Sequence, residues 1–441
     1  MSIKFVVTDK PITSISGLAY IGKQLDNKEF FFAINKVSRI KQSSPFISDF
    51  DCIKTMIGLI AIGKPDFDAV EEYRNDKYFK KSLKLKNVPS SPTLRQRIEE
   101  FSDVEWAIIR SFNIRILSEV IEDEFVIING KKYLIQDNDV TVLDNSNTKK
   151  EGVSWTYRHK DGYAPMMSYI GKNGFMLNTV LREGRDHSNC PGTLEYFLET
   201  MDMAHAISDI PTLTINDSGN DDIENILAYE NDEAHYIVKR NLRKESTEEW
   251  FSIAQMHCTK EKRLREGKVT YYASVPRTVK VKEKDEMVER TLRIVVVATE
   301  RKLNHSGQPF LIPEIDIETY WVNLDASEEE VEELYHQHGT SEQYHAEWKN
   351  ELGLERLPSG KFAANSTIML FGMIAFNLLR RLGKEALSSN KAPGKRGSRI
   401  RIRTVILNLM YMGGLIIESV RDITVRLWSG HAWTEAYMSV F

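Results

Sequence analysis

Four side chains capable of chemistry recur at a near-helical spacing in residues 334–352, a stretch that contains no proline. Tyr335 is followed three, seven and fourteen residues later by His338, Glu342 and Lys349. Because an α-helix turns once in about 3.6 residues, these offsets return to nearly the same side of a helix. We therefore expect one helical face to present a phenol, an imidazole, a carboxylate and an ammonium group. A solvated helix face that carries one tyrosine would give the same pattern.

Further carboxylates stand where strands are expected. Asp137 and Asp139 alternate onto one face of a predicted strand at 132–142. Ionised carboxylates on an inner strand are costly unless they hold a cation or another partner. Asp217 follows a short apolar strand at 213–215 and precedes Ser-Gly-Asn, so it is expected at the carboxyl end of a strand, where α/β sheets build their sites. A helix cap or an Asx-turn is the competing role for this aspartate.

Three such carboxylates, brought together by the fold, would suit phosphoryl transfer assisted by two metal ions. Oxygen ligands hold Mg²⁺ and leave coordination positions for water and phosphate. Two ions about 4 Å apart then stabilise the attacking and the leaving oxygen of an in-line displacement. This chemistry requires neither a general-base histidine nor a covalent nucleophile.

Composition predicts an ordinary globular protein of several domains. The chain has 441 residues, of which 41% are hydrophobic and 28% are charged. Its three cysteines form no Cys-x-x-Cys motif, which argues against a disulfide framework or a zinc finger and fits a reducing compartment. We expect a cytoplasmic protein that is not associated with a membrane. The net charge of −4 does not exclude DNA as a partner, because a basic footprint needs only one face.

The first third of the chain predicts a helical domain, residues 1–120. Ser90 is suited to cap a helix that has Pro92 near its start. The first turns of this helix carry Arg95 and Arg97, which can contact phosphates and base edges. A helical DNA-binding domain is therefore expected here, although any surface helix could look the same.

Strand-like segments dominate from Phe125 onward and are interrupted by a helix, which indicates a mixed α/β sheet. We divide the rest of the chain into a first part of a core (121–234), a β-rich insertion (235–325), the remainder of the core (326–387), and a basic linker with a C-terminal helical segment (388–441). Two apolar helices expected at 368–382 and 403–420 would serve the core or a dimer surface.

The spacing Tyr-x2-His-x3-Glu-x6-Lys resembles the signature of the group 1 DDE transposases of bacterial insertion sequences, in which the second member is normally Arg. Further segments look like the same family, in order along nearly the whole chain: Pro-Ser-Ser-Pro-Thr-Leu-Arg-Gln-Arg at 89–97, Asp-Gly-Tyr-Ala-Pro at 161–165, Leu-Arg-Glu-Gly at 181–184, Asp-Ser-Gly-Asn at 217–220, Lys-Arg-Asn-Leu-Arg-Lys at 239–244 and Leu-Pro-Ser-Gly-Lys-Phe-Ala-Ala-Asn at 357–365.

The resemblance implies an α/β fold with an RNase-H-like catalytic core, a β-rich insertion and an N-terminal helical DNA-binding domain. It implies a metal triad of Asp139, Asp217 and Glu342 that binds Mg²⁺, or alternatively Mn²⁺, for endonucleolytic cleavage and strand transfer in DNA recombination. The first aspartate of the family tends to precede Ser or Thr by two residues. Asp139, with Thr141 after it, meets this condition, and Asp137 is the reserve.

The resemblance also implies partners. Tyr335 and Lys349 match family residues that grip the DNA backbone at the transposon end, and His338 stands at the position of the usual arginine. An imidazole lacks the two-pronged guanidinium and is only partly charged near neutral pH. The expected partners are double-stranded DNA, as inverted-repeat ends and as target, and a second copy of the chain in a synaptic complex.

Two other functions are compatible with the sequence. A catalytically impaired, DNA-binding relic of a transposase is suggested by His338. A His/Glu metallohydrolase is suggested because His338, Glu342 and His345 would share a helical face. The second alternative is weaker because the His-Glu-x-x-His motif is absent.

Overall fold

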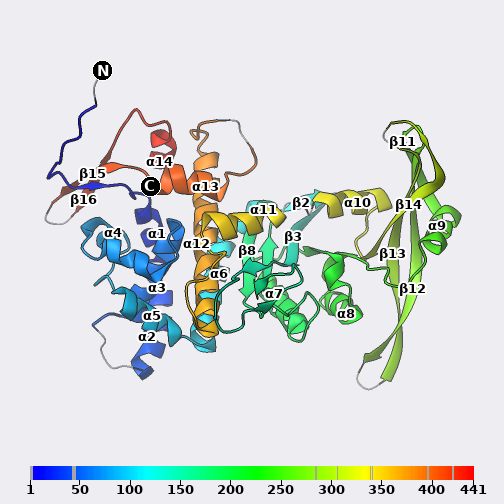
Figure 1. The fold of residues 1–441 in the computed structure, drawn as a ribbon, viewed down its shortest axis with the longest axis horizontal. Coiled ribbons are helices and arrows are strands. Elements are labelled where there is room, and N and C mark those ends of the chain that lie inside the picture. Colours follow the sequence, from blue (N-terminus) through cyan, green and yellow to red (C-terminus); the bar gives the residue numbers. More distant parts are fainter. Residues whose placement is uncertain are drawn as a thin grey trace.

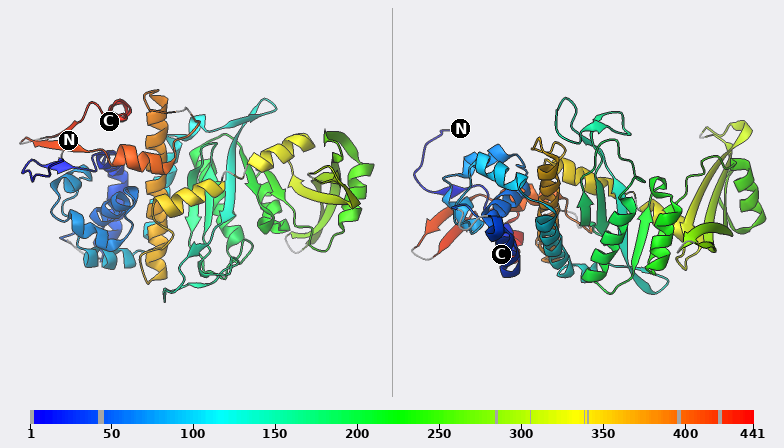
Figure 2. Two further views of the ribbon diagram at one scale, coloured as in Figure 1. Left: turned by 45° about the horizontal axis from the view of Figure 1, so that its top comes forward. Right: turned by 90° about the horizontal axis from the view of Figure 1, so that it is seen from below.

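The computed structural model describes residues 3–41, 46–283, 286–304, 306–337, 339, 341–394, 397–419 and 422–441. Figure 1 shows an elongated molecule. The N-terminal helices and the C-terminal strands form one end, a long helix crosses the middle, and a set of long strands forms the other end. The views in Figure 2 show the same order of parts along the molecule.

The N-terminal region is helical, as predicted. Its helices are α1 (Leu18–Leu25), α2 (Lys28–Lys41), α3 (Asp49–Ala61), a 3-10 turn (Phe67–Tyr73), α4 (Lys77–Ser82), α5 (Ser91–Glu99) and α6 (Asp103–Ser118). Helix α5 begins as the sequence predicted, because the Ser90 side chain accepts a hydrogen bond from the backbone N–H of Thr93 and a proline occupies the first turn.

The long central helix is α12 (Phe362–Ser388). Its length and an 18-residue window with a mean hydropathy of 1.6 would suffice to cross a membrane, but 83% of that window is buried inside the protein. The apolar side chains of α12 share one core with those of α3, α6 and the C-terminal helix α14 (Thr434–Val440). Of the two roles predicted for this helix, the core and a dimer surface, the structure shows α12 in the core. The N-terminal helices pack against it.

One ten-stranded sheet runs through the rest of the molecule. In spatial order its strands are β11 (Cys258–Arg265), β12 (Lys268–Glu283), β13 (Glu286–Leu303), β14 (Pro309–Val322), β10 (His235–Lys239), β9 (Thr212–Asn216), β3 (Lys131–Val140), β7 (Met166–Ile170) and β8 (Phe175–Val180), and β2 (Val126–Ile128) also pairs with β3. Strands β3, β9 and β10 are parallel, whereas β7 and β8 continue the sheet as an antiparallel meander.

The β-rich segment predicted between residues 235 and 325 is an extension of this same sheet. Strands β11 to β14 pair antiparallel with one another, and β14 pairs with β10 through Val238 and Trp321. Helix α9 (Thr247–Met256) packs on these long strands, with Trp250 buried beneath it.

Helices cover both faces of the central strands. On one face lie α7 (Thr193–Ile207) and α8 (Ile223–Asn231), whose Phe197 and Tyr229 belong to the same core cluster as Val140 of β3. On the other face lies α10 (Glu328–Gln337), whose Leu334 and Tyr335 pack against Ile215 of β9 and its neighbours. The two faces are therefore distinct, and α10 belongs to the face onto which Ile215 projects.

The helix expected to span residues 334–352 is divided into three segments. After α10 come α11 (Ser341–Ala346) and a π-helical turn (Glu347–Glu351). Gly339 lies between α10 and α11, and glycine disfavours helix by about 1 kcal/mol relative to alanine. His338 falls outside the described residues.

The helix expected at 403–420 is wrong beyond its first turns. Helix α13 (Ile402–Val405) and a π-helical turn (Ile406–Met410) are followed by the strand β15 (Gly414–Glu418), which pairs with β16 (Ile423–Leu427) and with β1 (Ile12–Thr13). The helical segment ends at Met410, and two adjacent glycines follow three residues later, which disfavours a longer helix. A Cβ atom on Gly414 would lie 2.4 Å from the Val425 side chain, so this close strand pairing requires glycine.

Candidate active site

Asp139 and Asp217 stand level with each other at the carboxyl ends of neighbouring parallel strands. The register of β3 and β9 pairs Asp137 with Ile215, and each of the two aspartates lies two residues further on. Side chains two residues apart share a face of a strand, and neighbouring strands are about 4.8 Å apart. The structure thus brings the first two members of the predicted triad together on the face that α10 covers.

Local hydrogen bonds fix the Asp217 carboxylate. Its backbone is still extended, with φ −75° and ψ 175°, and its side chain caps the 3-10 turn Ser218–Asn220. Oδ1 accepts hydrogen bonds from the backbone N–H of Gly219 at 3.0 Å and from the Asn220 side-chain amide at 3.2 Å. The turn-capping role considered in the sequence is therefore real, and it holds the carboxylate in place.

Asp139 is fixed by a histidine of α11. Nε2 of His345 lies 3.1 Å from Oδ2 of Asp139, and Nδ1 of the same ring lies 3.3 Å from the Tyr169 hydroxyl. His345 is only 5% exposed. The histidine that the sequence offered to a metallohydrolase is therefore turned toward Asp139, and the tyrosine behind it was missed by sequence reasoning because it comes from the distant strand β7.

A buried polar network on the opposite face holds the two strands in register. The side-chain amide of Asn138 donates to Asn216 at 3.2 Å, and the amide of Asn216 donates to the Tyr229 hydroxyl at 2.9 Å. Ser168 lies on β7, and its hydroxyl donates a hydrogen bond to the side-chain oxygen of Asn138. Satisfied buried networks rigidify their surroundings. The alternation of Asn138 and Asn216 with the aspartates was the available sequence signal for this network.

Both ends of the predicted signature approach the two aspartates. Nζ of Lys349 donates to the carbonyl of Val142, just beyond β3, at 2.6 Å. Burial lowers the pKa of this lysine, and the charges of Glu355 and Asp139 act in the opposite sense. Burial also raises the pKa of Tyr335, and the negative charges of Asp217, Glu318, Asp137 and Asp139 raise it further. Tyr335 and Lys349 thus both lie near the acidic centre.

A short hairpin adds two residues that the sequence did not single out. The Tyr157 hydroxyl donates to the carbonyl of Val140 at 3.1 Å. Burial raises the pKa of Tyr157, with further contributions from Asp139 and Asp217. The neighbouring Arg158 is exposed and its charge acts on Lys349. This arginine places an additional positive charge beside the acidic centre.

Glu342, the third predicted acid, is exposed in the first turn of α11. It lies three residues before His345, so roughly one helical turn separates it from the residue that contacts Asp139. In the portion of the chain that the structure describes, one group of three acidic or histidine side chains has its possible metal-binding atoms within 4.8 Å of one another. It consists of Glu318, Glu332 and His336. Asp139, Asp217 and Glu342 therefore do not converge that closely.

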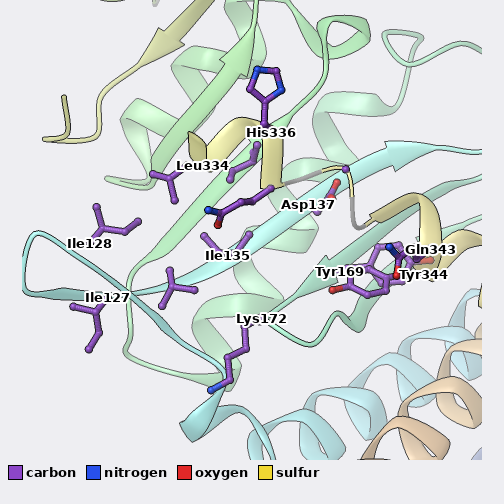
Figure 3. Close-up of a pocket in the computed structure, with 15 residues that line it drawn as sticks. Ile127, Ile128, Ile135, Asp137, Tyr169, Lys172, Leu334, His336, Gln343 and Tyr344 are labelled. Carbon is purple, nitrogen blue, oxygen red and sulfur yellow. The ribbon is translucent and has the colours of Figure 1, made fainter. Parts of the chain in front are cut away.

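Asp137, the reserve candidate, faces a cavity of about 790 Å³ between the β2–β3 hairpin and the helices α10 and α11. Figure 3 shows Ile127 and Ile128 of the hairpin on one side of this cavity and Tyr169, Gln343 and Tyr344 on the other. Asp137 is 6% exposed. On β3 it lies two residues before Asp139 and is therefore further from the carboxyl end of the strand.

Arg95 and Arg97 of α5 make contacts within the N-terminal helices. The Arg95 guanidinium lies 5.0 Å from the centre of the Phe67 ring. Nη1 of Arg97 lies 3.6 Å from Oδ1 of Asp49, and the Arg97 side chain is 15% exposed. Helix α5 and strand β3 lie on opposite sides of α12 (Figure 1). The two arginines are thus not brought to the acidic centre.

Comparisons with known proteins identify the family to which the chain belongs. The family described as "Transposase DDE domain group 1" matches residues 3–441. No curated protein matches the chain. Among solved structures, a chain of the cryo-EM structure of the piggyBac transposase synaptic complex with hairpin DNA is similar, with 12% identity, a TM-score of 0.45, and coverage of 92% of this chain and 82% of that chain.

Proposed function

Because the chain belongs to the group 1 DDE transposases, we propose that Asp139, Asp217 and Glu342 are its metal-binding triad and that its DNA substrates are the ends of a bacterial insertion sequence. Transposase activity, a reaction that cuts and joins DNA, follows from membership of the family. The assignment of individual residues and of the type of element is our inference.

The observation that carries the residue assignment is the parallel register of β3 and β9, which sets Asp139 level with Asp217. We infer that β8, β7, β3, β9 and β10 are the RNase-H-like core and that β11 to β14 interrupt it. This interpretation is supported because Asp139 lies on β3 and Asp217 directly follows the neighbouring strand β9, whereas Glu342 lies on α11, which comes after the interruption and α10.

The donor set fits divalent cations such as Mg²⁺ or Mn²⁺, which prefer carboxylate oxygens. When bound, such ions would stabilise the attacking and the leaving oxygen of an in-line displacement at phosphorus. The protein's own residues prepare the site. His345 orients Asp139, the turn after β9 orients Asp217, and Glu342 stands on α11, the helix that also carries His345.

Positive and polar groups around the triad are suited to hold the DNA backbone. Lys349 and Arg158 bring ammonium and guanidinium charges to the rim of the acidic centre, and both groups bind phosphate oxygens well. Tyr335 brings a phenol near the same carboxylates. We infer that a phosphodiester lies across these groups, with a second copy of the chain holding the other end of the element.

The test is a cleavage assay on DNA that carries the inverted repeats flanking the coding sequence. We expect strand cleavage with Mg²⁺ or Mn²⁺, none after chelation, and none for Asp139→Asn or Asp217→Asn. Asp161→Asn, which changes an exposed carboxylate on the nearby strand β6 (Asp161–Tyr163), is the matched control and should retain activity. Cleavage by the Asp139→Asn and Asp217→Asn proteins at the native rate would refute the assignment.

A further inference from the structure

A short hairpin beside the acidic centre presents an exposed indole. Strands β5 (Ser154–Trp155) and β6 (Asp161–Tyr163) pair through Trp155 and Asp161. Trp155 is 60% exposed, and Tyr157 in the turn is 50% exposed. Aromatic rings are costly to leave in water, and exposed ones gathered on one element are typical of a binding surface.

Several contacts hold this hairpin firmly. The backbone N–H of Thr156 donates to the carbonyl of Lys160 at 2.9 Å, and the Thr156 hydroxyl donates to the same carbonyl at 2.8 Å. Nζ of Lys160 lies 3.0 Å from Oδ2 of Asp144, which belongs to β4 (Leu143–Asp144), the other neighbour of β6. Trp155 is therefore presented on a rigid base, and a rigidly held surface loses little conformational entropy when a ligand binds it.

The turn of the hairpin has a histidine where glycine would fit better. The backbone N–H of His159 donates to the carbonyl of Thr156 at 3.0 Å, and His159 has a φ of 57°, in the left-handed region. Three-residue hairpin loops commonly end in a left-handed residue, and glycine suits that position because any side chain adds strain. The His159 ring lies 6.2 Å from the Trp155 ring, centre to centre. Strained residues of this kind cluster at functional sites.

The hairpin lies next to the acidic centre. The Tyr157 hydroxyl donates to the carbonyl of Val140, the residue after Asp139, at 3.1 Å. Besides burial, the charges of Asp139 and Asp217 raise the pKa of Tyr157. Trp155 precedes Tyr157 by two residues, so their Cα atoms are at most about 8 Å apart. The indole is therefore close enough to meet a nucleotide that adjoins the phosphate to be cut.

Resting on the function proposed above, we propose that the hairpin at 154–163 binds an unpaired nucleotide of the DNA beside the scissile phosphate, with its base stacked on Trp155. Every nucleobase offers a flat face to an aromatic ring, so this contact tolerates any sequence. The exposed guanidinium of Arg158 complements the neighbouring phosphate, and the ring of His159 extends the surface that the base meets. The base pair must open first, because a base inside a duplex is stacked on its neighbours.

The test measures binding of the full chain, with a chelator present to prevent cleavage, to two duplexes that carry the inverted repeat and its flank. One duplex is fully paired, and the other is mismatched at the nucleotides beside the cleavage site. Trp155→Ala should weaken binding to the mismatched duplex by about 10–100-fold, the range for one base on an aromatic ring, and change binding to the paired duplex less. Trp155→Phe should keep most of the affinity. Trp428→Ala, which removes an indole that is 70% exposed after β16, is the control and should bind as the native protein does.

His159→Gly separates binding from folding. Glycine adopts a φ of 57° without strain, so this variant should be at least as resistant to chemical denaturation as the native protein. It should nevertheless bind the mismatched duplex more weakly. Native affinity for that duplex would remove His159 from the binding surface.

A cross-linking experiment locates the base. Iododeoxyuridine placed beside the cleavage site is joined by light to an aromatic side chain stacked on it, and mass spectrometry identifies that residue. We expect the cross-link at Trp155. A cross-link elsewhere, native affinity of Trp155→Ala for the mismatched duplex, or a change of its oligomeric state in place of its DNA affinity would overturn the proposal. Cleavage of paired DNA by the native protein with Mg²⁺ would leave the proposed function standing in each of these cases, whereas no cleavage of any DNA would overturn both.

Discussion

Nε2 of His345 on α11 lies 3.1 Å from Oδ2 of Asp139 on β3. This contact joins the strand that carries the first acid of the proposed triad to the helix that carries the third. The ring is held from behind by Tyr169, whose own ring packs against it edge to face at 5.3 Å. A buried imidazole that touches one oxygen of a carboxylate sets the direction of the other, so His345 is a positioning residue for Asp139.

The first prediction concerns this histidine. His345→Ala should slow strand cleavage by about 10–100-fold, the usual cost of removing an outer partner of a metal ligand, while affinity for end DNA stays within about twofold because the DNA contacts lie elsewhere. Single-turnover cleavage at saturating DNA measures the rate, and a binding assay measures the affinity. His257→Ala, at an exposed position after α9, is the control. Native cleavage by His345→Ala would remove the positioning role.

The second prediction distinguishes the two aspartates of β3. Asp139→Ala, Asp217→Ala and Glu342→Ala should each abolish metal-dependent cleavage and leave DNA binding largely intact, because each carboxylate holds a cation and phosphate contacts lie elsewhere. Asp137→Ala should keep measurable cleavage, since Asp137 faces the cavity beneath α10. Loss of cleavage in Asp137→Ala together with normal cleavage in Asp139→Ala would exchange their roles.

The sequence predicted the local features of the site better than the long-range ones. The alternation of Asp137 and Asp139 and the cap at Ser90 follow from periods and turn chemistry that act over a few residues. The contact between His345 and Asp139 joins residues 206 positions apart, and no local pattern encodes such a distance. Sequence periodicity also extended one helix past Gly413 and Gly414, where strand pairing with Val425 decides the structure.

The third prediction concerns the buried ion pair that holds the π-helical turn containing Lys349. Nη2 of Arg380 on α12 lies 2.6 Å from Oε2 of Glu347, and the two side chains are 2% and 7% exposed. Burial lowers the pKa of Arg380, and the charge of Glu347 opposes that shift. Glu347 keeps a second partner, because Nη1 of Arg399 lies 3.3 Å from the same oxygen. Arg380→Met should therefore lower the free energy of unfolding by somewhat less than the about 3–5 kcal/mol that an unpaired buried charge costs.

Chemical denaturation of the full chain measures this loss. Arg381→Met is the matched control, because Arg381 pairs with the half-exposed Glu119 and Glu385, and pairs of that kind contribute about 0.2–1 kcal/mol. Equal unfolding free energies for the two variants would show that the pair of Arg380 and Glu347 adds no more than a surface contact.

The fourth prediction separates structural from DNA-binding roles on α5. Arg97→Ala should destabilise the N-terminal helices by about 1–3 kcal/mol, since its partner Asp49 is buried. Arg95→Ala should leave unfolding nearly unchanged and weaken DNA binding, with a shallower dependence of affinity on salt. Both are made in the full chain because these helices share their core with α12. Salt dependence identical to that of the native chain would exclude Arg95 from the DNA interface.

The last prediction concerns His338, which lies outside the described residues and occupies the position where the family usually has arginine. A phosphate should then lie within reach, and activity should favour the protonated imidazole. Arginine is always charged and can bind two phosphate oxygens at once, whereas histidine is mostly neutral at about pH 8. His338→Arg should therefore raise the rate of strand cleavage, most clearly at about pH 8, and His338→Ala should lower it. Cleavage rates that are equal for the His, Arg and Ala proteins from about pH 6 to about pH 8 would mean that residue 338 faces solvent and takes no part in holding DNA.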